Sequence, residues 1–251
     1  MSTQSLVPVG VAVAVLVAVT VLALSLARVH VRRDTLVAVL RAAGQLTVVA
    51  LLIAWVFAHP GAVLLYLVLM LAAATWTSTS RVGLGRGTYP HLGLAIAAGA
   101  LAATVPVLLS GALPLRAQTV LPFVAQIIGG SMTAVSLTGG RLRDDVATEW
   151  DTVEAWLSLG ALPRTAVAPQ VRRAVARSLV PAIDQTRNAG LVVLPGAFVG
   201  LLLGGASPYE AAQVQLLVLV GLLAAESVAS VLSAHLLAGR VGSVRPTVRS
   251  H

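Results

Sequence analysis

Long stretches without charged side chains constrain this sequence more than any other feature. The first covers residues 6–27, a run of 22 residues with no charge. A helix of about 20 apolar residues crosses the roughly 30 Å hydrocarbon core of a membrane. Lipid offers the backbone no hydrogen-bond partner, and the sequence lacks the alternating pattern of a membrane β-barrel. We therefore predict an all-α fold, a polytopic membrane helical bundle.

Seven segments have the length and apolar character of membrane spans. They cover residues 6–27, 35–58, 62–80, 92–112, 119–138, 188–203 and 211–238. The sixth is short and contains Pro195 and Gly196. The first is longer than the apolar core of a signal peptide and has no basic residue before it, so we expect a retained span.

Arginine is distributed unevenly over the connections between these spans. The chain contains no lysine, and sixteen of its 17 arginines fall in the first, third and fifth connections, their flanks and the C-terminal tail. The other connections hold only Arg116. Cytoplasmic loops of membrane proteins are enriched in basic residues. Seven spans therefore predict an outside N-terminus, a cytoplasmic C-terminus and a multi-pass protein of the plasma membrane.

The fifth connection, residues 139–187, is far longer than the others and holds six of the nine acidic residues. Its first part has apolar residues at spacings of four, four, three and four, which predict an amphipathic helix over 141–159. These residues are Leu142, Val146, Trp150, Val153 and Leu157. Gly160 and Pro163 end this helix, and a second helical stretch follows over 169–183.

Two interpretations of the helix 141–159 remain open. It lies on its own protein or on the bilayer, or it docks a soluble partner. Helices at a membrane surface usually carry a basic polar face, whereas this one is acidic over most of its length. The acidic face favours a protein partner.

Glu154, Ala155, Leu157 and Gly160 form a short motif within this helix. The stretch resembles the EAA-type loop of ABC importer permeases, in which Glu and Ala on a short cytoplasmic helix precede a Gly by fixed spacing. In those permeases the helix seats in a groove of the ATP-hydrolysing subunit. The resemblance implies that these four residues couple the chain to an ATPase.

Separated motifs between Arg41 and Gln215 extend the resemblance. They are Arg41-Ala-Ala-Gly-Gln-Leu46, Ile128-Gly-Gly-Ser-Met-Thr-Ala-Val-Ser-Leu137 followed by Arg141, Glu154 with Leu157–Gly160, Gly190-Leu-Val-Val-Leu-Pro-Gly196, and Gly200, Gly204 or Gly205, Pro208, Ala211 and Gln215. In this order they resemble the FetB/YbbM-like ABC transporter permease family, which is linked to iron export in bacteria and aluminium tolerance in plants. The resemblance implies one transmembrane permease domain over 1–251 with a coupling segment 139–187, a permease homodimer and two ATPase subunits.

The sequence departs from that family at five positions. The family usually has Asn where this chain has Gly130. It usually has Met-Met-Thr-Gly-Gln after Leu-Pro-Gly, where this chain has Ala197, Phe198 and Val199, then a glycine and Leu201. These replacements leave the choice of substrate open.

The chain lacks the residues for ATP hydrolysis and for most enzyme chemistry. It has no lysine and hence no phosphate-binding loop motif, and its Gly83-x-Gly85-x-Gly87 run is typical of a turn. We expect no cofactor on this chain, with ATP and magnesium bound by the partner. The chain has no cysteine, no paired carboxylates within one span and no Ser/His arrangement at useful spacing, so we predict a transport subunit and not an enzyme.

Polar residues within the spans are the candidates for a substrate pathway. Glu226 lies in the seventh predicted span and serves either as cation or proton site or in helix packing. The other candidates are Gln45, Gln126, Asn188, Pro195, Gly196 and Gln215, each with a packing role as alternative. A self-contained ion-coupled carrier using Glu226 is the alternative function.

The ligands of a metal cargo stay unassigned. The five histidines are scattered at span ends and loops, and sulfur ligands are scarce. A hard cation would need oxygen ligands, which Glu226 and backbone carbonyls supply. Beyond the ATPase and a second permease copy, membrane lipid is the expected partner, because the basic residues follow the loops of a membrane protein and not a nucleic-acid surface.

Overall fold

The protein is seen here in a computed structural model that describes residues 6–27, 32–191 and 193–246. Within those ranges every regular element is a helix, and the β-type pairing is one isolated bridge between Ala189 and Val193. The chain divides into two compact units, Met1–His59 and Pro60–His251. The predicted all-helical fold is confirmed.

The first unit consists of two helices that contact each other. These are α1, Leu6–Leu26, and α2, Arg32–Ala58. They confirm the first two predicted spans to within a few residues. Gln45 lies on α2 with an exposed side chain.

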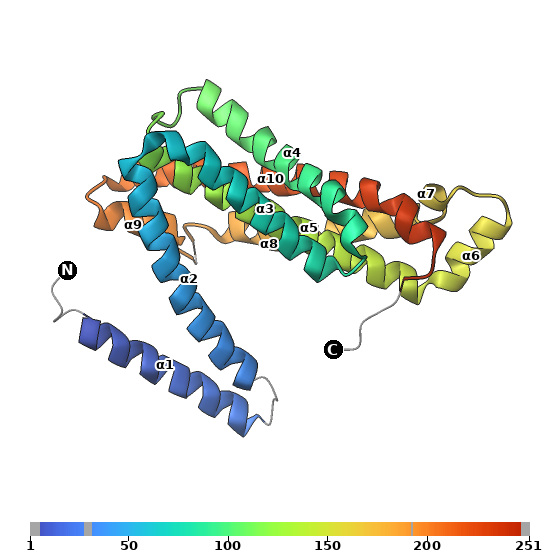
Figure 1. The fold of residues 1–251 in the computed structure, drawn as a ribbon, viewed down its shortest axis with the longest axis horizontal. Coiled ribbons are helices and arrows are strands. Elements are labelled where there is room, and N and C mark those ends of the chain that lie inside the picture. Colours follow the sequence, from blue (N-terminus) through green and yellow to red (C-terminus); the bar gives the residue numbers. More distant parts are fainter. Residues whose placement is uncertain (1–5, 28–31, 192, 247–251) are drawn as a thin grey trace. The chain divides into compact units, whose positions relative to one another are not determined.

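The second unit holds the remaining helices (Figure 1). They are η2 (Pro60–Ala62), α3 (Val63–Val82), η3 (Arg86–Thr88), α4 (Tyr89–Leu109), α5 (Ala117–Thr148), α6 (Trp150–Ser158), α7 (Pro163–Ala166), α8 (Ala168–Asn188), α9 (Gly196–Leu203) and α10 (Pro208–Ser243). α3, α4, α5, α8 and α10 pack against one another. α6 and α7 lie at one end of this bundle and α9 at the other.

Six helices in the described part of the chain are long and apolar enough to cross a membrane: α1 to α5 and α10. The sixth predicted span, residues 188–203, is wrong as a single helix. Asn188 is the last residue of α8, residues 189–191 and 193–195 are not helical, and α9 has only 8 residues. Pro195 lacks a backbone N–H and stands at the N-cap of α9, so the helix restarts only after it.

The predicted end of the fifth span at Thr138 is also wrong, because α5 continues for ten more residues to Thr148. Charged residues from Arg141 onward end the apolar run but not the helix. At about 1.5 Å per residue, the 32 residues of α5 measure about 48 Å and the 36 of α10 about 54 Å. Both helices are therefore longer than a hydrocarbon core of roughly 30 Å.

The periodic apolar residues of segment 141–159 face the protein's own core, which is one of the two interpretations that the sequence left open. Leu142, Val146 and Val153 are buried, and Trp150 and Leu157 are partly buried against the same core. The segment is nevertheless two helices, because α5 ends at Thr148 and α6 begins at Trp150. The apolar spacing survives this break, since both helices lie on the same core.

Small residues allow the helices of the second unit to approach closely. A methyl group on Gly99 of α4 would lie 2.5 Å from the carbonyl oxygen of Ala225 on α10. A methyl group on Gly139 of α5 would lie 2.6 Å from a side-chain carbon of Val82 on α3. Such contacts hold membrane helices together where lipid removes the hydrophobic drive for association.

Two separate sets of buried hydroxyl groups join α3, α5, α8 and α10. Ser136 donates to Ser78 at 3.1 Å, which joins α5 to α3. Thr138 donates to Ser178 at 2.7 Å, and Ser178 lies 3.3 Å from Ser230, which joins α5, α8 and α10. Each hydroxyl is thereby satisfied without a charge.

Most arginines of the second unit gather at one end of the bundle, here called the arginine-rich end. Arg143 of α5 donates to the carbonyl of Val82 at the end of α3, over 2.7 Å. Arg240 of α10 and Arg164 of α7 pack against Gly87 and Gly239. Arg116 caps the opposite end of α5. This grouping agrees with most of the predicted sorting of arginines, but Arg187 is an exception, because it stands at the far end of α8, about 28 Å along that helix from Ala168. The side of the membrane on which the arginines lie stays a prediction.

Candidate functional site

A polar cavity of about 480 Å³ lies between α5, α8, α9 and α10. It is lined by Gln126, Asp184, Gln185, Asn188, Val193, Leu194, Pro195, Gly196, Ala197 and Gln215. Five of the predicted pathway residues therefore line one space, although they come from distant parts of the chain. They are Gln126, Asn188, Pro195, Gly196 and Gln215.

The break between α8 and α9 forms one wall of this cavity. Gly190 has a φ of +81°, a conformation that favours glycine, and its N–H donates to the carbonyl of Val193 over 2.9 Å. Pro195 then fixes an extended backbone before α9. Broken helices at membrane depth occur where the backbone lines a cavity and does not face lipid.

Gln215 is the most buried polar residue of the cavity. Its side chain is 6% exposed, and its Oε1 atom has no hydrogen-bond partner among the described residues. An unsatisfied buried carbonyl oxygen costs about 1–3 kcal/mol. A ligand that this oxygen can bind, a cation or a hydrogen-bond donor, removes that cost.

The other polar residues of the cavity are exposed on the surface of the single chain. Gln126, Asp184 and Asn188 are exposed. Asp184 lies 3.7 Å from Arg187, one turn away on α8. Asp184 is thus paired with an arginine and also lines the cavity.

The cavity lies well inside the length of the bundle. Gln126 is ten residues from Arg116 and 15 residues from Arg141 along the same helix. These separations correspond to about 15 Å and 22 Å. Polar side chains at such depth face a water-filled path or another protein surface, because exposure to lipid is costly.

Glu226 and Gln45 are not part of this cavity. Glu226 lies 11 residues, or about 16 Å, beyond Gln215 along α10. Its carboxylate packs against Gly130, where a methyl group would be 2.8 Å from Oε1. Gln45 belongs to the first unit. The structure therefore separates the proposed cation site at Glu226 from the cluster of amide residues.

A second candidate site is the surface of α6 at the arginine-rich end. Val153 is fully buried and anchors the helix on the core. Glu154 and Ala155 are exposed, as their predicted coupling role requires, whereas Leu157 is partly buried against the core. Gly160 has a φ of +86°, so the chain turns there in a conformation that favours glycine.

Sequence reasoning missed the apolar part of the α6 surface. Trp156 is 52% exposed, Leu159 82% and Leu162 72%. Exposed aromatic and aliphatic residues around a charged one are typical of protein interfaces. The sequence held a signal for this exposed surface. Trp156 and Leu159 are three residues apart and lie outside the apolar face that Val153 and Leu157 define.

Two ion pairs fix α8 against the C-terminal end of α5 at the arginine-rich end of the bundle. Arg177 pairs with Asp145, and Arg173 pairs with Glu149, whose carboxylate also accepts a 2.8 Å hydrogen bond from Gln170. The hydrogen bond from Arg173 holds the pKa of Glu149 below its ordinary value; partial burial opposes this, and Gln170 adds to it. The carboxylate is therefore ionised in neutral solution.

Preformed metal coordination is not visible in the cavity. No three His, Asp or Glu side chains come together within the described ranges. Oxygen atoms of Asp184, Gln126 and Gln215 are the donors on offer, and they suit a hard cation that keeps part of its water shell.

Comparison with known proteins gives a consistent group of membrane proteins. The profile described as "Uncharacterised protein family (UPF0014)" matches residues 8–241. The rice protein named UPF0014 membrane protein STAR2 is 35% identical over 212 residues, which is 83% of this chain and 74% of the rice protein. Protein ALUMINUM SENSITIVE 3 of Arabidopsis thaliana is 35% identical over 195 residues, 76% of this chain and 71% of that protein.

A bacterial relative gives the same result. The probable iron export permease protein FetB of Escherichia coli is 30% identical over 206 residues, 81% of this chain and 80% of FetB. No solved structure matches the chain. The profile match and these long alignments show that the chain belongs to the UPF0014 family of multi-pass membrane proteins.

Proposed function

We propose that this chain is the permease subunit of an ATP-driven transporter, in which a separate ATPase chain docks on α6. One observation carries the proposal: α6 exposes Glu154, Ala155 and Trp156, and Leu159 directly after it is exposed as well. The chain has no lysine and hence no phosphate-binding loop of its own. ATP and magnesium therefore belong to the partner.

Two helices join the docking surface to the cavity. α5 carries Gln126 towards one end and stops next to α6 at the other. α8 carries Arg173 at the docking end and Asn188 at the cavity. Movement of α6 against an ATPase would tilt or shift both helices, and this is a physical route by which ATP hydrolysis reaches the cavity.

We assign a metal cation as the cargo. The support is the oxygen-rich lining of the cavity and the name of FetB, a probable iron export permease. Export is the direction that this relative's name indicates. Ala197 lies in the lining at a position where the resembling permeases usually carry Met, so the cavity differs there from theirs.

A second copy of the chain is expected to complete the pathway. Gln126, Asp184 and Asn188 are exposed in the single chain at a depth where lipid contact is costly. A homodimer that covers this face would turn an open polar surface into an enclosed path. The complex would then contain two permease and two ATPase subunits.

The test is a pull-down of the tagged protein from gently solubilised native membranes. Wild type should retain an ATP-binding subunit, and Glu154→Arg should lose it, since truncation of an interface hot spot costs about 2 kcal/mol or more, roughly thirtyfold in affinity. Arg116→Glu, an equal change of charge at the opposite end of α5, should retain the ATPase. Equal retention by both variants would refute docking on α6.

A self-contained carrier that uses Glu226 is the alternative. Glu226 is half-buried, and its carboxylate has no hydrogen-bond partner within the described ranges. Purified protein in liposomes would then transport its cargo with a pH gradient and no ATP. Transport that needs ATP and an added ATPase, and that persists in Glu226→Gln, would exclude this carrier.

A further inference from the structure

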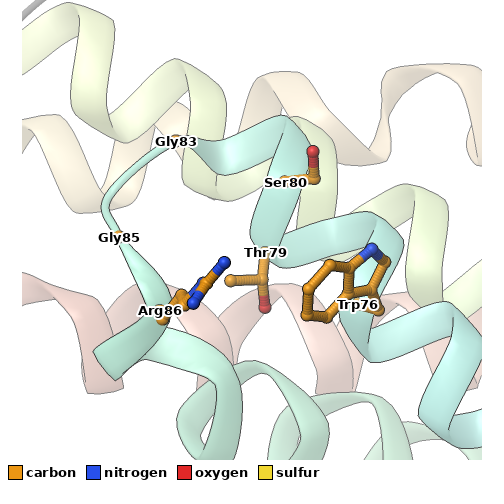
Figure 2. Close-up of a pocket in the computed structure, with 6 residues that line it drawn as sticks. All are labelled: Trp76, Thr79, Ser80, Gly83, Gly85 and Arg86. Carbon is orange, nitrogen blue, oxygen red and sulfur yellow. The ribbon is translucent and has the colours of Figure 1, made fainter.

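A small pocket at the arginine-rich end is separate from the cavity and from α6. It lies where α3 ends and the chain turns into η3, and its volume is about 240 Å³. Its lining residues are Trp76, Thr79, Ser80, Gly83, Gly85 and Arg86. Figure 2 shows the Arg86 guanidinium pointing towards Thr79, with the Trp76 ring on the other side of Thr79.

The arginine side chains around the pocket favour an anionic ligand. Arg86 is exposed and makes no ion pair within the described part of the chain. Residues 35–143 contain no Asp or Glu, so no carboxylate is near in sequence. Arg240 approaches the same turn from α10, where its Nη1 would lie 2.7 Å from a methyl group on Gly87.

The backbone of this turn depends on glycine. Gly83 has a φ of +71° and Gly85 a φ of +87°. A methyl group on Gly83 would lie 2.8 Å from Nη1 of Arg143, which donates to Val82. The glycines let the chain turn sharply between the guanidinium groups of Arg143, which pairs with Asp144, and Arg240.

The position of the pocket along α3 indicates a lipid. α3 is a candidate membrane span, and Trp76 is 61% exposed one to two turns before its end. Tryptophan gathers at the depth of lipid headgroups, and arginine beside it contacts their phosphates. The Thr79 hydroxyl donates to the carbonyl of Thr75, so it is left as an acceptor for a hydroxyl group of a ligand.

We propose that this pocket binds the phosphate group of an anionic membrane lipid. Arg86 pairs with the phosphate, Trp76 packs against the glycerol region, and Thr79 accepts a hydrogen bond from a hydroxylated headgroup. This inference does not depend on the ATP-driven function.

The test uses purified full-length protein, delipidated and then given equal amounts of phosphatidylglycerol and phosphatidylcholine, with retained lipid counted by native mass spectrometry. Wild type should retain phosphatidylglycerol. Arg86→Gln should retain about fivefold less, since each arginine near an anionic surface contributes about 1 kcal/mol. Arg86→Lys should recover most of this loss, and Arg116→Gln, an exposed arginine at the other end, should behave as wild type.

A second arm separates a lipid from a soluble phosphate compound. Glycerol phosphate and inorganic phosphate are added at increasing concentrations to the lipid-loaded protein. We expect neither to displace phosphatidylglycerol. Displacement by glycerol phosphate at micromolar concentration would overturn the lipid as ligand, and unchanged phosphatidylglycerol retention in Arg86→Gln would overturn the site.

Discussion

The two ends of the second unit are built in opposite ways. At the arginine-rich end, ion pairs and buried aliphatic residues fix α5, α6, α7 and α8 to one another. At the cavity end, the helix is broken between α8 and α9, and the buried oxygen of Gln215 has no partner in the described chain. The first end is suited to receive a force and the second to bind and release a ligand.

Gln215→Leu should separate binding from stability most strongly. It removes an unsatisfied buried oxygen, so the free energy of unfolding should rise by about 1–3 kcal/mol. It also removes a ligand for a cation, so the affinity for the cargo should fall roughly tenfold to a hundredfold. Thermal unfolding in detergent and cation titration by calorimetry measure the two effects. A variant that is destabilised and binds normally would show that Gln215 only packs.

Gly242→Ala should loosen the arginine-rich end. Its new methyl group would lie 2.4 Å from the carbonyl oxygen of Pro163, which is backbone and cannot rotate away. We expect a loss of about 1–3 kcal/mol in unfolding free energy and weaker ATPase retention. Gly140→Ala is the control, because no atom lies within 4 Å of its methyl group. Equal melting temperatures of the Gly242→Ala and Gly140→Ala variants would contradict the close packing of α7 on α10.

Gly160→Ala and Gly190→Ala compare the two ends directly. Both glycines have positive φ, +86° and +81°, and a methyl group meets no atom within 4 Å at either. Each substitution should cost about 1–2 kcal/mol in backbone strain. Gly160→Ala should weaken retention of the ATPase and leave cargo binding unchanged. Gly190→Ala should weaken cargo binding and leave retention of the ATPase unchanged. If both variants change the same measurement, the two ends do not work as distinct sites.

The ion pair of Glu149 should give a small, pH-dependent effect. Its pKa lies below the ordinary value near 4.5, so the folded state favours the ionised carboxylate. That stabilisation is complete above the pKa of the unfolded chain and is lost as pH falls through the lower folded pKa. Glu149→Gln should therefore be less stable than wild type at pH 7, and the difference should shrink below about pH 4.5. Melting temperatures at both pH values test this, and a difference that grows at acid pH would contradict it.

The fold could be predicted from sequence where hydropathy and periodicity agree. The apolar runs of α1 to α4 and α10 gave correct helices, because lipid forces such runs into helical structure. The spacing from Leu142 to Leu157 correctly predicted the buried face of α5 and α6. The C-terminal end of α5 was placed too early. The first charged residues mark the end of the apolar run, whereas the helix ends where its backbone hydrogen bonds end.

The sites were predictable in part. The polar residues within apolar segments identified three of the five polar lining residues of the cavity, since such residues are costly in lipid. Their meeting could not be predicted, because it depends on the packing of α8 against α5 and α10. Asp184 and Gln185 were missed as lining residues since they precede the apolar run that was assigned as a span.

The set of hydroxyl groups that joins α5, α8 and α10 has a consequence for movement. A hydroxyl donates and accepts, and it changes partner by rotation about a single bond. Ser178 already lies within reach of both Thr138 and Ser230. Ser178 can therefore exchange one hydroxyl partner for the other by a single rotation, so a small shift of α8 against α5 and α10 leaves no buried hydroxyl without a partner.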